Sequence, residues 1–105
     1  MASKSIFKKE TTNSSGFYQW ESPPIPDGER WMLIRIGFSS NDLVKLGLFW
    51  GGNQFREIVV KAGTVDFELN REFTGDGVSK LKLGVSSIGV PSVEFAMWLD
   101  ATRRG

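Results

Sequence analysis

Few side chains in this chain could perform acid–base or nucleophilic chemistry, and two of the most useful residue types are missing. The 105 residues include no histidine and no cysteine. Ser–His and Cys–His nucleophilic pairs are therefore excluded, as are thiolate metal sites and disulfides. Ser79 and Lys80 are adjacent, but neighbouring residues of a strand point to opposite faces of a sheet. We interpret them as a turn serine beside a solvated lysine, not as a Ser–Lys dyad.

Three carboxylates, Asp66, Glu68 and Glu72, are spaced by two residues or a multiple of two, which places them on one face of a strand. A glycosidase needs two carboxylates that face each other across a cleft and differ in proton affinity. A row along a single strand face creates no such difference. This row is typical of a solvated face that also discourages edge-to-edge aggregation.

Turns supply the remaining candidates for ligand binding. Residues 75–77 and the pair Asn41-Asp42 offer oxygen atoms of the kind that calcium prefers, but neither has the spaced acidic loop of an EF-hand. Gly51-Gly52 lacks the lysine and the following helix of a phosphate-binding loop. The sequence thus predicts no catalytic residue, no cofactor and no metal site, and the chain is expected not to be an enzyme.

Aromatic side chains are the stronger candidates for binding, since the chain has four tryptophans. Trp50 continues an apolar row and is interpreted as a core residue. Trp31, Trp98 and Phe49 fall opposite the main apolar rows, where aromatic rings can stack on sugars or become buried against another subunit. Subunit contact is favoured because it also accounts for aliphatic residues on the same faces. The candidate interaction residues are Ile6, Phe7, Trp31, Leu33, Phe49, Val59 and Trp98.

Strands must position these side chains, because apolar and polar residues alternate with a period of two along much of the chain. The alternation is plain in residues 28–51, where runs at roughly 29–39 and 43–51 flank a Ser-Ser-Asn-Asp turn. We expect these runs to form a long hairpin that is covered on one face by a second sheet. The expected core residues are Ile34, Ile36, Leu46, Leu48, Phe67, Leu69, Leu83, Phe95 and Met97.

The fold class follows from the number and spacing of these strands. No segment has a helical apolar period of useful length, and about seven strands, or eight with the N-terminal segment, recur at intervals of about 8 to 12 residues. This pattern predicts an all-β protein with two antiparallel sheets in a jelly-roll-like sandwich. An immunoglobulin-like sandwich is the alternative.

The domain plan has two parts. Residues 1–15 are expected to be a flexible N-terminal arm, and residues 16–105 a single β-sandwich domain of a size suited to one core. Ile6 and Phe7 are the apolar point of the arm and could dock on a neighbouring subunit or as an edge strand.

Charge and hydropathy bear on partners and location. The net charge of +1 gives no electrostatic reason to expect nucleic acid or an anionic membrane as a partner. No apolar run approaches the roughly 20 residues of a membrane helix, and the N-terminus lacks the apolar core of a secretory signal. We therefore expect a soluble protein.

Three stretches, residues 26–33, 67–83 and 95–100, combine strands and turns in a way that resembles small β-sandwich proteins on the virions of tailed bacteriophages. The resemblance implies a non-enzymatic structural or assembly protein, such as a capsid decoration protein or a tail or fibre component. It also implies partners such as the major capsid protein, and a place in the virion after assembly in the host cytoplasm. The alternative function is a carbohydrate-binding module or a receptor-binding sandwich of the tail-fibre type.

Self-association is expected from the surplus of apolar residues on the outer faces. Left in water, such residues could form a larger contiguous patch than monomers usually expose. Identical neighbours are the simplest cover, because soluble assemblies are mostly closed and symmetric. The trimer is favoured on the virion resemblance alone.

Overall fold

The computed structural model describes residues 3–89 and 92–104 of the chain. These residues form eight β-strands and no helix, which confirms the all-β prediction. Accordingly, the described ranges contain no helix long and apolar enough to cross a membrane. The strands are β1 (Ser3–Thr11), β2 (Phe17–Glu21), β3 (Arg30–Ser40), β4 (Val44–Trp50), β5 (Asn53–Val60), β6 (Gly63–Thr74), β7 (Leu81–Ser87) and β8 (Glu94–Arg103).

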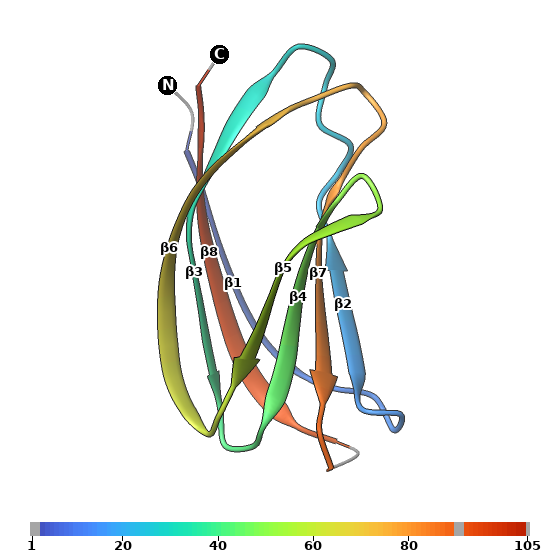
Figure 1. Ribbon diagram of the computed structural model, residues 1–105, viewed down its shortest axis with the longest axis vertical. Coiled ribbons are helices and arrows are strands. Elements are labelled where there is room, and N and C mark those ends of the chain that lie inside the picture. The colour runs from blue at the N-terminus through green and yellow to red at the C-terminus, as the bar shows by residue number, and fades with distance from the viewer. Residues whose placement is uncertain (1–2, 90–91, 105) are drawn as a thin grey trace.

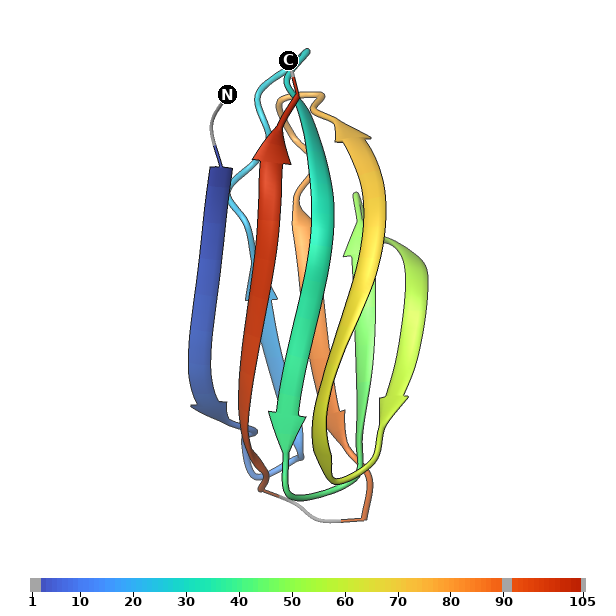
Figure 2. The same cartoon turned by 90° about the vertical axis from the view of Figure 1, so that its left-hand side faces the viewer.

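Two antiparallel sheets of four strands face each other across the core (Figure 1). Sheet A has the strand order β1-β8-β3-β6, and Figure 2 shows these four strands side by side in that order. Sheet B has the order β2-β7-β4-β5. Eight strands that pass repeatedly from one sheet to the other make a jelly roll, the first of the two predicted arrangements.

The expected hairpin of residues 28–51 is not formed. β3 pairs with β6 and β8 in sheet A, whereas β4 pairs with β5 and β7 in sheet B. The turn between them carries the chain from one sheet to the other. The alternating pattern indicates which side chains of a strand face the core. It is the same whether two strands pair in one sheet or lie in opposite sheets with the core between them.

The core lies between the sheets and contains most of the expected residues. Phe67 and Leu69 are half-buried and pack against it, while Phe38, which is fully buried, stacks on Phe95 with 5.2 Å between ring centroids. Ile34 is only half-buried, contrary to prediction. The expected residues that are buried are Ile36, Leu46, Leu48, Leu83, Phe95 and Met97.

A β-bulge in β3 explains why Ile34 is displaced. Leu33 pairs with Ala101 and Arg35 with the adjacent Asp100, so Ile34 is an extra residue relative to β8. On the other side of β3, Asn70 of β6 adopts a φ of 49°. One extra residue reverses the faces of the alternation. Leu33 therefore points into the core and is 1% exposed.

The N-terminal segment also differs from the expected flexible arm. Residues 3–11 form edge strand β1, which pairs with β8 from Ser3–Thr102 to Thr11–Glu94. Ile6 packs against the core beside its pairing partner Leu99. The segment thus adopts the edge-strand arrangement that the sequence left open, and it completes sheet A.

Candidate functional site

The outer face of sheet B has a hollow of about 310 Å³. Strand alternation and register build it from three rows of residues that cross the strands. The central row places two glycines side by side, because Gly47 of β4 pairs with Gly84 of β7. Gln19 of β2 and Glu57 of β5 pair with these glycines and end the row. Because glycine has no side chain, the centre of this sheet face lies lower than the side chains around it.

Two phenylalanine rings lie over the paired glycines. A Cβ atom added to Gly84 would lie 3.7 Å from Cε1 of Phe49 and 3.8 Å from Cε2 of Phe17. A Cβ atom added to Gly47 would lie 3.0 Å from Cε1 of Phe49. Phe17 is 42% exposed, and Phe49 is half-buried. The glycines leave room for the edges of both rings close to the sheet, and we define Phe17 and Phe49 together as the aromatic platform.

Polar side chains surround this platform. Nε2 of Gln54 donates a hydrogen bond to Oε2 of Glu57 over 3.0 Å, and Nζ of Lys45 lies 3.8 Å from Oε1 of Glu57. Nζ of Lys82 lies 5.5 Å from the centroid of the Phe49 ring, close enough for a cation–π interaction. The rim therefore offers amide, carboxylate and ammonium groups within reach of anything that stacks on the platform.

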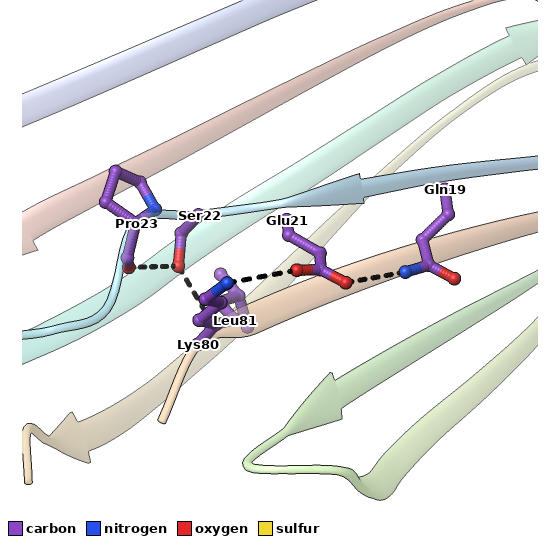
Figure 3. Close-up of polar contacts among 6 residues, drawn as sticks. All are labelled: Gln19, Glu21, Ser22, Pro23, Lys80 and Leu81. Atoms are coloured by element: carbon purple, nitrogen blue, oxygen red, sulfur yellow. Dashed lines mark hydrogen bonds and ion pairs between the residues drawn. The ribbon is translucent and has the colours of Figure 1, made fainter. Parts of the chain in front are cut away.

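At the β2 side of the hollow, a chain of contacts holds the rim in place (Figure 3). Nε2 of Gln19 donates to Oε1 of Glu21 over 2.7 Å, and Nζ of Lys80 lies 3.5 Å from Oε2 of the same carboxylate. Glu21 thus links the end of β2 to the residue that precedes β7. Gln19, whose side chain lines the hollow, is oriented by this link.

The seven residues predicted from the sequence as interaction residues do not form one patch. Phe49 is in the platform, and Val59 lies on the same sheet face opposite Lys45, 56% exposed. Phe7, 65% exposed, lies on the outer face of sheet A beside Trp98, with which it pairs. The other predicted residues, Ile6, Trp31 and Leu33, are turned toward the interior.

The prediction that Trp31 and Leu33 lie on an outer face is wrong. Both precede the bulge at Ile34, which brings their side of β3 inward. The indole Nε1–H of Trp31 donates to Oε1 of Glu29 over 3.0 Å.

Trp98 is on the outer face of sheet A, as expected, but one face of its indole packs against the neighbouring strand β3. Its indole lies directly over Gly37, where a Cβ atom would overlap the ring atoms Cε2, Nε1 and Cζ2. Nε1–H donates to Oδ2 of Asp66 over 3.3 Å, and Nε of Arg35 lies 3.1 Å from Oδ1 of that carboxylate. Trp98 is thus half-buried, with Phe7 as its more exposed neighbour.

The acidic row of β6 is matched by arginines on β3. Arg35 lies between Asp66 and Glu68, and NH1 of Arg30 lies 3.8 Å from Oε1 of Glu72. All of these side chains are substantially exposed. Such cross-strand pairs contribute little to stability and describe a solvated sheet face.

The other sequence candidates have structural partners of their own. The hydroxyl of Ser79 donates to Oδ2 of Asp76 over 2.7 Å, while Lys80 reaches Glu21, so the two neighbours point apart. Asp76 also accepts hydrogen bonds from the backbone N–H groups of Val78 and Ser79, and these contacts lower its pKa to about 2. Across residues 3–89 and 92–104, no group of three or more acidic side chains is arranged to hold a metal ion.

The sequence reasoning missed Phe17, Gln19 and Gln54 as parts of a site. A usable signal was present in Gly47 and Gly84, each in the middle of an alternating strand. Glycine weakens a strand interior and often marks the close approach of another group. Here that group is an aromatic ring of the same sheet.

Comparisons with known proteins support the fold alone. No protein-family model matches the chain, and no curated protein matches it. Among solved structures, the insecticidal delta-endotoxin Cry8Ea1 from Bacillus thuringiensis is similar with a TM-score of 0.56 and 16% identity. The match covers 92% of this chain and only 20% of the toxin.

Two smaller structures match over nearly their whole length. The CBM36-1 domain of a multidomain xylanase, from the hindgut metagenome of Trinervitermes trinervoides, has a TM-score of 0.54 and 8% identity, with 99% of each chain covered. PirA has a TM-score of 0.51 and 15% identity, with 89% of this chain and 91% of PirA covered. The chain is therefore an all-β, two-sheet sandwich of a kind that occurs both within large proteins and as a module of this size.

Proposed function

We propose that the protein is a non-catalytic binding module whose ligand is a carbohydrate bound on the outer face of sheet B. The observation that supports this is the aromatic platform over Gly47 and Gly84, with polar side chains around it. This was the alternative function at the sequence level. The geometry favours it over the subunit contact, because the predicted contact residues are divided between different faces and the interior.

The chemistry of the hollow suits a sugar. One face of a pyranose ring carries mainly C–H groups, which pack well on the flat face of a phenylalanine ring. The hydroxyls at the ring edge both donate and accept hydrogen bonds, and they would meet Gln19, Gln54 and Glu57 at the rim. The hollow is shallow and open, so it suits a segment of a longer chain as well as a single sugar.

Fold similarity to the xylanase CBM36-1 domain is compatible with this proposal, since that module has nearly the same extent as this chain. The absence of histidine and cysteine from the sequence further supports binding without catalysis. The arginine–carboxylate pairs on sheet A give no pair of acids with divergent surroundings, which a glycosidase would need.

A glycan array followed by calorimetric titration of the best ligand tests the proposal. Phe49→Ala should weaken binding by about two- to twelvefold, because an aromatic contact is worth about 0.5–1.5 kcal/mol beyond its area. Phe7→Ala is the matched control, since it removes an exposed phenylalanine from the other sheet. The proposal fails if no glycan binds, or if Phe49→Ala binds its glycan as tightly as the wild type.

The glycine pair allows a finer version of this test. Gly47→Ala places a methyl group 3.0 Å from Cε1 of Phe49, so the ring must give by a few tenths of an ångström, whereas the nearest contact at Gly84 is an ordinary 3.7 Å. We expect Gly47→Ala to weaken glycan binding and Gly84→Ala to leave it nearly unchanged. Equal losses in the two variants would contradict the platform geometry.

An assembly role is the second candidate, favoured by the exposed Phe7 next to Trp98 on sheet A. In this case the chain is a homotrimeric virion component that binds other virion proteins through sheet A. Because residues 3–11 are a strand of the sandwich, deleting residues 1–15 would damage the fold, and a point substitution is the better probe. Phe7→Ser should reduce the mass measured by light scattering, whereas Val78→Ser, an exposed loop control, should not. A wild-type protein that is monomeric at high micromolar concentration would refute self-association.

A further inference from the structure

We infer that the end of the sandwich beneath residues 22–28 is a second binding site, which takes a small, neutral, apolar molecule about the size of two fused rings. This site is separate from the hollow on sheet B and does not depend on the function proposed for it. The loops of this end lie on the same side as the beginning of β1 and the end of β8 (top of Figure 1).

A cavity of about 330 Å³ opens at this end. Trp20 of β2 and Trp50 of β4 line it from sheet B, and Trp31 of β3 lines it from sheet A. Prolines 23, 24 and 26 of the connecting loop form its rim. Three of the chain's four tryptophans thus converge on one space that they do not fill.

Two polar side chains of the cavity wall, Glu29 and Ser22, have partners within the protein. Glu29 accepts the indole hydrogen bond of Trp31 and lies 3.8 Å from NH2 of Arg103. The hydroxyl of Ser22 donates to the carbonyl oxygen of Pro23 and accepts the N–H of Leu81, as Figure 3 shows. These two side chains therefore need no ligand to satisfy charge or hydrogen bonding, and the remaining lining is mainly aromatic, aliphatic and proline side chains.

The rim is held in position before any ligand arrives. The N–H of Gly28 donates to the carbonyl oxygen of Gly75, and the N–H of Gly75 donates to that of Glu29. A Cβ atom at Gly75 would overlap the carbonyl oxygen of Pro26, so the two loops are in close contact. Proline fixes its own φ angle, which further limits the motion of residues 22–28. A preformed rim reduces the conformational entropy lost on binding.

The volume limits the size of the ligand. An apolar cavity of about 150 Å³ in another protein accommodates benzene. A space of about 330 Å³ therefore fits a body of two fused rings or a short branched chain, at the lower end of the volumes of ligand sites.

The probe for the test is 1-aminonaphthalene, a neutral fluorescent dye of two fused rings, which is the size inferred for the ligand. It should bind one molecule per chain, and the tryptophans at the cavity wall should transfer fluorescence energy to it. Ala101→Phe, at a half-buried position of β8 that lines the cavity, should reduce the affinity for the dye at least tenfold. Ala96→Phe is the matched control, because Ala96 is also a half-buried alanine of β8 but lies on its outer face. It should bind the dye as the wild type does.

Two results of the dye titration would overturn the inference. The first is that the dye does not bind, and the second is that it binds Ala101→Phe and wild type equally. If Ala101→Phe does not fold, the smaller Ala101→Leu must still lower the affinity. If the dye does not bind and light scattering shows a wild-type dimer that Ala101→Phe abolishes, the cavity is assigned to a second copy of the chain. Glycan binding should be unaffected by Ala101→Phe, so the two proposed sites can fail separately.

Discussion

Gly37 and Trp98 form a contact whose energetic consequence can be worked out in sign as well as size. The glycine lies in β3, and its φ angle is not in the left-handed region, so alanine suits the backbone there. The added methyl group would overlap the indole of Trp98, which must swing away and lose its hydrogen bond to Asp66. Overpacking of this kind costs about 1–3 kcal/mol. The lower entropy of the unfolded alanine chain returns about 0.4–1 kcal/mol.

We therefore expect Gly37→Ala to destabilise the protein by about 1.3 kcal/mol, the middle of the range of about 0–2.6 kcal/mol that these two effects span together. In a Trp98→Ala background the overlap is gone, and the same substitution should stabilise the protein by about 0.4–1 kcal/mol. Urea unfolding followed by far-ultraviolet circular dichroism measures both effects, since this signal does not depend on tryptophan fluorescence. If the effect of Gly37→Ala has the same sign and size in both backgrounds, the two residues are not coupled and the reasoning is refuted.

Three further predictions concern the core, the bulge and the loop of Asp76. Phe38→Ala removes a fully buried ring and should lower the free energy of unfolding by about 3–5 kcal/mol in urea melts; a loss under about 1 kcal/mol would contradict its place in the core. Asn70 has a φ of 49°, which valine adopts poorly and glycine adopts freely. In the same urea melts, Asn70→Val should lower the free energy of unfolding by about 1–2 kcal/mol, while Asn70→Gly should leave it nearly unchanged. Equal losses in the two variants would argue against the bulge. The pKa of Asp76 is lowered to about 2 from 3.8 because the ionised carboxylate accepts hydrogen bonds from Ser79 and Val78. The stabilising contribution of this loop should be complete above pH 3.8 and lost as the pH falls through 2. The Asp76 carboxyl resonance in nuclear magnetic resonance should titrate near pH 2, and a midpoint near 3.8 would show that these bonds do not persist in solution.

The strands and the fold class could be predicted because alternation is a local property of the sequence. β8 and β4 follow it without interruption, and their inward residues, such as Met97 and Leu46, are buried as expected. What alternation cannot supply is the identity of the neighbouring strand. The hairpin prediction failed for this reason: β3 and β4 are adjacent in sequence and belong to opposite sheets.

In the part of β3 that precedes the bulge, the sequence does not indicate which side chains face the core. Trp31, Met32, Leu33 and Ile34 are all apolar, so alternation allows either Trp31 and Leu33 or Met32 and Ile34 to point inward. One hint existed in β6, where Arg71 interrupts the apolar row. In the structure Arg71 pairs with Leu33, and its guanidinium lies 4.7 Å from the centroid of the Phe55 ring across the open edge of the sandwich.

The platform was missed because its two rings belong to strands far apart in the sequence. Phe17 is in β2 and Phe49 is in β4, and only the position of β7 between those strands brings both rings over Gly84. Strand order of this kind depends on tertiary packing. A local pattern of residue types contains no information about it.

The position of β8 within sheet A has a consequence for how the chain folds. β8 is the eighth strand in the sequence, yet it lies between β1 and β3, and Ser3 pairs with Thr102 (Figure 2). β1 therefore has no partner in its sheet until residues 94–103 dock, and that step closes a loop of nearly the whole chain. Proteins dominated by such distant pairings fold slowly, in milliseconds to seconds. During that interval β1 presents an unpaired edge with Phe7 on it, which makes the partly folded chain the form most prone to aggregate.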